Sequence, residues 1–311
     1  MSQVKAMVDK YLTNASLGLF QDDSRFVAER VLTPVKVVQD SGLIGQYGKE
    51  HLRAVSTQMG GRGKAAYFEP GVVSSTSYYV EEYGLVGTVT AADYRNVEKP
   101  FDADMDMNMA LMQIMKIGRE RALAAIMTSS SYITNYDTLS GTSQWSDYNN
   151  SDPLANFKTA RNSVLDNAGV LPNKVILPYK VFDALRYHPA ILENLGFTRQ
   201  RAGQMTSAEI ASALDVQEVI IPTGVYNSSD RGQTDSLAQI WGNHAVFFYA
   251  PNAASLRQQS LGFNVFINKG VKVYKNPVFN PPGANDILVN QAWDDVITDA
   301  NCAYLFSNAI A

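Results

Sequence analysis

The sequence predicts an α+β fold in which helices and strands do not follow a regular βαβ series. The first third of the chain is rich in glycine and in extended segments. One long helix is expected over residues 102–129, and short helices and strands follow it without an internal repeat. Elements grouped in this way favour α+β over a doubly wound parallel sheet.

The composition is that of a globular protein with few charged side chains. With 311 residues, of which 46% are hydrophobic, the chain suits one large domain or two modest ones. Charged residues make up 18%, below the roughly 25% that is usual for soluble domains, which suggests that partners cover part of the surface. The net charge of −4 argues against binding nucleic acid through charge alone.

Signals for membrane insertion and export are missing from the sequence. It has no apolar run of about 18 residues, so we expect no membrane span. Residues 1–5 begin without the apolar region of a secretory signal peptide, and we expect the chain to be cytosolic when it is made.

The N-terminal segment predicts a short helix followed by an arm. Residues 1–20 place apolar side chains at helical spacing, which indicates an amphipathic helix. These side chains are Val4, Met7, Val8, Tyr11 and Leu12. Residues 31–47 look extended but too glycine-rich for a core strand, so we expect an arm that lies on something else.

A long loop is expected next. Residues 50–76 are the least core-like part of the chain, and Met59–Lys64 reads as a flexible, basic turn. Residues 77–90 are rich in Tyr and Val, as strands are. Loops of this length are usually functional or disordered, so we expect a two-stranded excursion that projects from the body.

The helix over 102–129 is expected to be a rod of about 37 Å. Acidic residues begin it, and Arg119 and Arg121 follow in its second half, as the helix dipole prefers. Its expected apolar stripe is Met107, Leu111, Met115, Ala122 and Ile126, broadened by Met105, Met109 and Met112. Such a stripe usually faces a core, although methionine also suits an adaptable interface.

The second half predicts mixed helices and strands. A helix over 154–167 should end at Gly169, and a helix over 207–214 should follow Thr206. The remaining expected elements are a helix over 179–185 that Pro189 ends, and strands over 174–177, 217–221, 237–241, 245–249, 263–267, 271–274, 286–293 and 295–306. The strands over 237–241 and 245–249 should be joined tightly at Gly242-Asn243.

Catalytic and metal-binding motifs are largely missing. The loop Gly60–Lys64 is followed by two alanines rather than by Ser or Thr and a helix, so it does not match a phosphate-binding loop. None of the three histidines, His51, His188 and His244, has a partner at metal-ligand spacing. We expect His188 to interact with carbonyls at a helix end, and the single cysteine, Cys302, to be a small buried side chain.

Clustered charges have ordinary explanations. Asp102, Asp104 and Asp106 cannot all share one helical face, so a helix start explains them better than a metal site does. Asp294-Asp295 reads as a turn or a solvated pair. The basic residues of Arg199–Gly203, like Arg62 and Lys64, suggest exposed surface or a subunit contact rather than sequence-specific recognition of DNA.

Several motifs, taken in order, resemble the major capsid proteins of tailed bacteriophages. They are the arm with Pro34-Val-Lys-Val-Val and Gln46–Arg53, the loop to about Val89, the helix over 102–129, the block Asn173–Ile191 with Leu-Pro-Tyr and His-Pro, the block Ile240–Pro251 with Trp-Gly-Asn-His, and the closing Asp294–Phe306. Each motif is weak by itself, and their order over nearly the whole chain carries the resemblance.

The resemblance implies the phage major capsid fold, shared with encapsulins, and a division of the chain into five parts. These are an N-terminal arm (1–48), an extended β-hairpin loop (49–92), a peripheral domain with the long spine helix (93–168), a mixed α/β axial domain (169–275) and C-terminal strands that return to the core (276–311). Residues Gly60, Gly61, Arg62, Gly63 and Lys64 at the loop tip are the candidate subunit contacts.

The resemblance also implies a structural role without catalysis, cofactor or metal. The subunit would assemble with itself into pentamers and hexamers of an icosahedral shell around double-stranded DNA, which it would hold without sequence specificity. Scaffolding, portal and decoration proteins would be further partners, and no membrane would be involved. The protein would be made in the host cytoplasm and reside in the virion.

Two alternatives follow from the same sequence. An encapsulin nanocompartment would share the fold and package a cargo enzyme instead of DNA. A soluble enzyme with acidic residues assembled in space would need a compact first third, which the glycine-rich extended segments disfavour.

Overall fold

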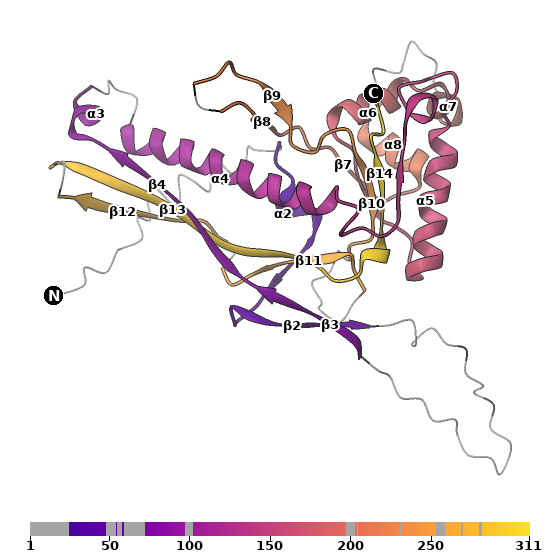
Figure 1. The fold of residues 1–311 in the computed structure, drawn as a ribbon, viewed down its shortest axis with the longest axis horizontal. Helices are drawn as coiled ribbons and strands as arrows, with labels where there is room; N and C mark the ends of the chain where they lie inside the picture. Colours follow the sequence, from indigo (N-terminus) through magenta and orange to yellow (C-terminus); the bar gives the residue numbers. More distant parts are fainter. Residues whose placement is uncertain are drawn as a thin grey trace.

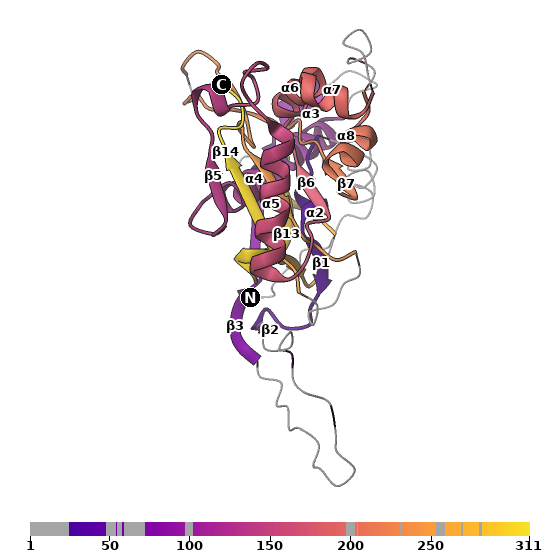
Figure 2. The same cartoon turned by 90° about the vertical axis from the view of Figure 1, so that its right-hand side faces the viewer.

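The computed structural model describes residues 25–47, 54, 58, 72–96, 102–196, 203, 205–230, 232–252, 259–268, 270–279 and 282–311. Two sheets lie along an elongated molecule, and the long helix α4 (Ala103–Met127) extends over the first of them (Figure 1). Helices α5–α8 gather around the second sheet at the other end (Figure 2). The helix expected within residues 1–20 and the residues Gly60–Lys64 lie outside the described residues.

The first sheet is built around one long strand. Strand β13 (Ala284–Ile297) pairs with β4 (Glu81–Val89) on one side, and with β12 (Lys272–Val278) and β11 (Gly262–Phe266) on the other. Strand β1 (Thr33–Lys36) runs parallel to β11 at the edge. Helix α4 packs on this sheet through Leu111, Met112 and Met115, which share a core with Val273, Ile287 and Val289.

Helix α4 begins and ends close to its predicted bounds, but its buried face differs from the prediction. Asp102 caps the helix by accepting a hydrogen bond from the Asp104 N–H at 2.9 Å. Ala122 is exposed and Ile126 only half-buried. The buried face instead continues through two charged residues, Arg119 and Glu120, to Leu123, Ala124 and Met127.

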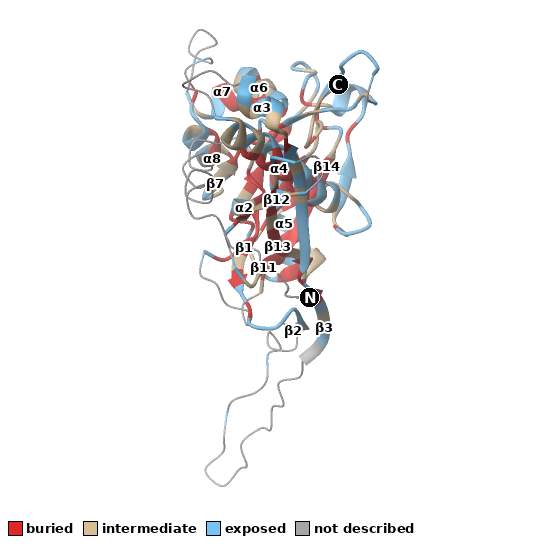
Figure 3. Cartoon of the chain, turned by 90° about the vertical axis from the view of Figure 1, so that its left-hand side faces the viewer, coloured by how far each residue is buried: buried red, intermediate tan, exposed pale blue. Residues whose placement is uncertain are grey.

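The second sheet has the order β5-β14-β10-β6-β7. Its strands are β5 (Tyr136–Thr138), β6 (Lys174–Ile176), β7 (Glu218–Ile220), β10 (Ala245–Phe248) and β14 (Ala303–Ser307). Around it lie α5 (Pro153–Ala168), α6 (Tyr179–Tyr187), α7 (Pro189–Asn194) and α8 (Ser207–Leu214). Every residue of β10 is buried, and Figure 3 shows the buried core continuing from this sheet toward α4 and β13.

Local signals in the sequence predicted several of these elements. Helix α5 ends at Gly169 in the left-handed conformation (φ 75°), which glycine adopts without strain. Helix α8 has the predicted bounds, because Thr206 and Glu209 form a reciprocal capping box. The Pro189 that ends α6 also begins a further helix, α7, which was not predicted.

Two predictions about strands were wrong in their connections. The strands on either side of Gly242 exist, but β9 (Leu237–Gln239) pairs with β8 (Val225–Asn227), whereas β10 pairs with β6 and β14. The tight turn therefore separates two sheets instead of closing a hairpin. The closing segment also differs, since Asp294 and Asp295 lie inside the continuous strand β13.

The segment expected to lie as an arm on something else packs partly on its own chain. Val31 and Leu32 are 0% and 1% exposed, and β1 belongs to the first sheet. Strand β2 (Ser41–Tyr47) pairs with β3 (Val72–Tyr79), which forms the base of the predicted excursion. The short helices α2 (Ala28–Val31), α3 (Ala91–Asn96), η2 (Gly141–Ser143) and η4 (Ala300–Cys302) complete the described elements.

Candidate subunit-contact surfaces and a buried polar network

The predicted contact residues Gly60, Gly61, Arg62, Gly63 and Lys64 lie outside the described residues, but the ribbon that leads to them is described. One face of the β2–β3 ribbon packs on the chain's own core through Ile44 and Tyr78. The opposite face exposes Leu43 (70%) and Tyr79 (62%). Large apolar side chains on an exposed ribbon are candidates for contacts with another subunit.

These exposed side chains were not among the predicted contact residues. Val38, just before the turn into β2, is 93% exposed and extends the same region. The alternation of buried and exposed residues along β2 could have revealed Leu43, because successive side chains of a strand point to opposite faces. The glycines of this segment obscured that pattern in the sequence.

An acidic groove of about 440 Å³ lies beside the base of the ribbon. Asp40, Glu81 and Glu82 line it and are exposed. Next to the groove, Asp294 accepts a hydrogen bond from the Tyr79 N–H at 2.8 Å. Partial burial raises the pKa of Asp294, and the nearby Glu81 carboxylate raises it further.

Asp294 and Asp295 were predicted to be a turn or a solvated pair, and this was wrong. Both belong to β13, where Asp295 accepts a hydrogen bond from the side-chain amide of Asn264 on β11. Burial raises the pKa of Asp295, while Asn264 and the Arg119 guanidinium oppose that rise. The pair therefore belongs to the packed junction between strands.

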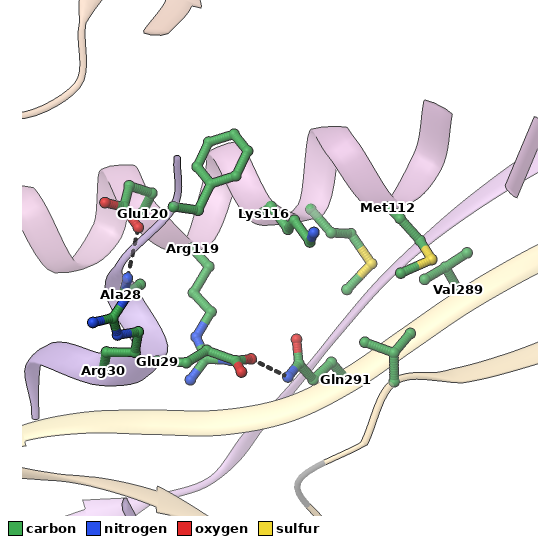
Figure 4. A pocket seen from close by; sticks show the side chains of 12 residues that line it. Ala28, Glu29, Arg30, Met112, Lys116, Arg119, Glu120, Val289 and Gln291 are labelled. Atoms are coloured by element: carbon green, nitrogen blue, oxygen red, sulfur yellow. Dashed lines mark hydrogen bonds and ion pairs between the residues drawn. The ribbon is translucent and has the colours of Figure 1, made fainter. Parts of the chain in front are cut away.

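Glu120 on α4 is the centre of a buried polar network, of which Figure 4 shows the hydrogen bond to Ala28. Its side chain is fully buried. One carboxylate oxygen accepts the N–H groups of Val27 and Ala28 at 2.9 and 2.7 Å, and the other accepts the indole N–H of Trp241 at 2.5 Å. Burial raises the pKa of Glu120, and these three donors together with Arg119 oppose the rise.

The neighbouring Arg119 connects α4 to the first sheet. Its side chain is 6% exposed, forms an ion pair with Glu29 and lies over the ring of Trp293 at 4.9 Å. Glu29 also accepts a hydrogen bond from Gln291 on β13 at 3.1 Å, and both residues line a cavity of about 150 Å³ under α4 (Figure 4). From the sequence, Arg119 was expected only to place a favourable charge in the second half of the helix.

The acidic residues at the start of α4 have separate structural roles. Asp102 caps the helix, Asp104 pairs with Lys275 and the Tyr94 hydroxyl, and Asp106 is exposed. Within the described residues, no group of three or more His, Cys, Asp or Glu side chains could hold a metal ion. In that same part of the chain, no helix is both long and apolar enough to cross a membrane.

His188 caps a helix, but at the opposite end from the one predicted. Its Nδ1 accepts the Ala190 N–H at 3.2 Å at the start of α7, and its Nε2 lies 3.0 Å from the Ser151 hydroxyl. That hydroxyl donates its own hydrogen to the carbonyl of Asp147, so it accepts the hydrogen on Nε2 of His188. Because Nδ1 is an acceptor, the imidazole carries only this one hydrogen and is neutral. Burial lowers the pKa of His188.

The other predicted residues are structural or lie outside the described part. His244 accepts a hydrogen bond at Nδ1 from the Asn308 N–H at 3.4 Å, and burial lowers its pKa. Cys302 is buried as predicted, and burial raises its pKa, which disfavours the reactive thiolate. His51 and most of Arg199–Gly203 lie outside the described residues.

We predict that E120Q lowers the free energy of unfolding by about 1–3 kcal/mol, the usual cost of leaving a buried donor unpaired. The amide of glutamine has one acceptor oxygen, so it cannot serve both the backbone N–H pair and the Trp241 indole. Urea unfolding of the subunit measures the change. E193Q, at an exposed position of α7, is the control, and an equal effect of both variants would contradict the role of Glu120.

We predict that His188 makes the subunit less stable as the pH falls below about 6.5, the ordinary pKa of histidine. Because the folded-state pKa is lowered, the unfolded chain takes up the proton first. The stabilisation that the neutral His188 gives is complete above the pKa that this residue has in the unfolded chain. It is lost as the pH falls through the pKa of His188 in the folded chain. H188N retains a capping acceptor without titrating, so its stability gap to the wild type should narrow between about pH 7.5 and 5. A constant gap in urea unfolding would refute this.

The sequence is similar to that of curated phage proteins. No family model matches it. It is 26% identical over 317 residues to the major capsid protein of Pseudomonas phage JBD67, with all of both chains covered. It is 23% identical over 248 residues to the major capsid protein of Burkholderia phage BcepMu, with 79% of this chain and 77% of that one covered.

Solved structures of phage proteins have a similar fold. A phage-related protein from Bordetella bronchiseptica RB50 matches with a TM-score of 0.72 at 21% identity, covering 98% of each chain. The capsid of cyanophage P-SCSP1u matches with a TM-score of 0.57 at 10% identity, covering 99% of this chain and 90% of that one. The resemblance to phage major capsid proteins is therefore confirmed, and the chain has the mixed helix-and-strand fold of phage capsid proteins.

Proposed function

We propose that this chain is the major capsid protein of a tailed phage, a structural subunit that assembles with itself into the shell of the virion. The observation that carries the proposal is the alignment with a major capsid protein over the full length of both chains. Because the alignment includes the first third of the chain, it favours a common architecture of the whole chain over similarity in a single domain. In this proposal, pentamers and hexamers close into an icosahedral shell around double-stranded DNA.

The surface of the described residues suits such a role. The β2–β3 ribbon exposes Leu43 and Tyr79 beside an acidic groove, and a ribbon of two strands gains stability when a neighbour covers it. Repeated contacts between unlike surfaces of identical subunits generate rings when their rotation closes. We propose no catalytic reaction, and this is supported by the structural role in the names of the curated relatives.

We propose a division into domains that departs from the expected one. Helix α4 and its sheet would form the peripheral domain, and the second sheet would form the axial domain together with α5–α8, so α5 leaves the expected peripheral domain (93–168). We assign β11 and β12 to the peripheral domain because they belong to the sheet of β13. Scaffolding, portal and decoration proteins, synthesis in the host cytoplasm, and sequence-independent contact with DNA remain proposed.

An encapsulin-type shell is the alternative. Such a shell would be built from subunits of the same fold. The similarity in sequence is to phage major capsid proteins, and we therefore prefer a shell that encloses DNA.

The first test is electron microscopy of the chain expressed alone, after size-exclusion chromatography. We expect closed shells or rings of capsomers. If only a monomer appears, co-expression with a scaffolding protein encoded beside it should produce shells. A subunit that stays monomeric under both conditions would overturn the proposed function.

We predict that deletion of Gly60–Lys64 prevents the formation of closed shells while the subunit stays folded. We propose that Arg62 and Lys64 bind the acidic groove of a neighbouring subunit, because Asp40, Glu81 and Glu82 offer charges of opposite sign there. Electron microscopy measures assembly, and circular dichroism checks folding. An unfolded deletion variant would place the segment in the core and contradict the prediction.

A charge exchange sharpens this experiment. R62E/K64E should block assembly, and adding E81K/E82K to the same chain should restore it, because the two charges are then reversed on both sides of the contact. If the exchange fails to restore shells, the acidic groove is not the surface that binds Arg62 and Lys64. The proposed capsid role would be unaffected by that result.

A further inference from the structure

The cavity beneath α4 combines an apolar wall with a buried cation. Met112 and Met115 of α4 and Val271 and Val289 of the first sheet form the apolar wall. All four side chains are at most 9% exposed, and Arg119, which also lines the cavity, is 6% exposed. Apolar walls with a small number of polar groups are the usual composition of a site for a small molecule.

The guanidinium of Arg119 has a donor that the described part of the chain does not satisfy. Its ion pair with Glu29 uses Nη1, whereas Nε is buried and has no hydrogen-bond partner within the described residues. Buried N–H groups are nearly always hydrogen-bonded, because removing them from water without an acceptor is costly. An acceptor at Nε would therefore complete the guanidinium without displacing Glu29.

The charges around the cavity favour an anionic acceptor. Among the residues that line it, the cations Arg30, Lys116 and Arg119 outnumber the carboxylates Glu29 and Glu120. Both carboxylates already accept hydrogen bonds from this chain. Hydrogen bonds between a guanidinium and a carboxylate are shorter and stronger than those between neutral groups. A single carboxylate is therefore the acceptor that best suits Nε of Arg119.

The volume of the cavity limits the rest of the ligand. It measures about 150 Å³, and an engineered apolar cavity of roughly 150 Å³ binds benzene. Met112 and Met115 can adapt to the outline of such a ligand, because methionine side chains are flexible. Arg30 forms part of the lining with a side chain that is 63% exposed, and this connects the cavity with solvent.

We propose that this cavity binds a small monocarboxylate whose apolar body is about the size of a benzene ring. The carboxylate accepts the Nε–H of Arg119, and the apolar body packs between Met112 of α4 and Val289 of β13 (Figure 4). Bound there, the ligand links the long helix to the first sheet beside the network of Glu120. The site is separate from the proposed subunit contacts.

Isothermal titration calorimetry of the full chain with benzoate tests the proposal. Benzylamine and benzyl alcohol serve as probes of similar size, one with a positive charge and one without charge. We expect benzoate to bind once per subunit and at least about tenfold more tightly than either of them, since it alone forms a charge-assisted hydrogen bond with Arg119.

Two variants locate the binding. V271F should abolish it, because the larger side chain fills the cavity, whereas V225F, at an exposed position of β8 outside the lining, should leave it unchanged. Thermal unfolding checks that both variants fold. K116Q removes one lining charge and should weaken benzoate binding about threefold or more while leaving benzyl alcohol unaffected.

Binding of benzoate that a folded V271F loses supports the proposal. The proposal would be overturned by the absence of saturable binding, by equal affinity for the three probes, or by binding that V271F leaves intact. If V271F does not fold, K116Q decides, and an unchanged affinity for benzoate would overturn the proposal. None of these results depends on shell assembly, so the proposal can fail while the proposed capsid function holds.

Discussion

The arrangement of the described chain depends on one buried carboxylate. A charged group taken out of water is tolerated only when hydrogen bonds replace its hydration. Glu120 meets this requirement with three donors from two distant segments, the backbone of Val27 and Ala28 and the indole of Trp241. Any shift of either segment against α4 would leave a buried charge or a buried donor without a partner, so both positions are fixed together.

Arg119 extends this constraint to the first sheet. Consecutive helical residues point in directions about 100° apart, so Arg119 faces Glu29 and Trp293 while Glu120 faces Trp241. Glu29 is in turn bonded to Gln291 of β13. Two adjacent residues of α4 thus link the first sheet, the N-terminal segment and the loop that leads into β10 of the second sheet. Helix α4 therefore does more than cover the first sheet, since it also fixes the position of that sheet relative to the second one.

The sequence could predict what depends on local chemistry. Asp102, Thr206 and Gly169 mark helix ends because their roles involve neighbours within a few residues. The buried face of α4 could not be predicted in the same way. The charges of Arg119 and Glu120 interrupt the apolar pattern of the helix. Two of the three donors to Glu120 are backbone N–H groups, and because every residue except proline has such a group, the sequence does not indicate which ones it binds. Strand pairing had the same difficulty, since β13 pairs with β4 from the first third of the chain.

The base of the predicted contact loop illustrates how a subunit can be prepared for assembly. Ile44 and Tyr78 fix one face of the β2–β3 ribbon on the chain's own core, together with Val296 of β13. The Tyr79 N–H is bonded to Asp294 of the same strand. Binding costs less when the contacting segment is already ordered. In the proposed assembly, a ribbon that is anchored before any neighbour arrives would need no ordering at its base, and only its exposed face, with Leu43 and Tyr79, would remain to be buried.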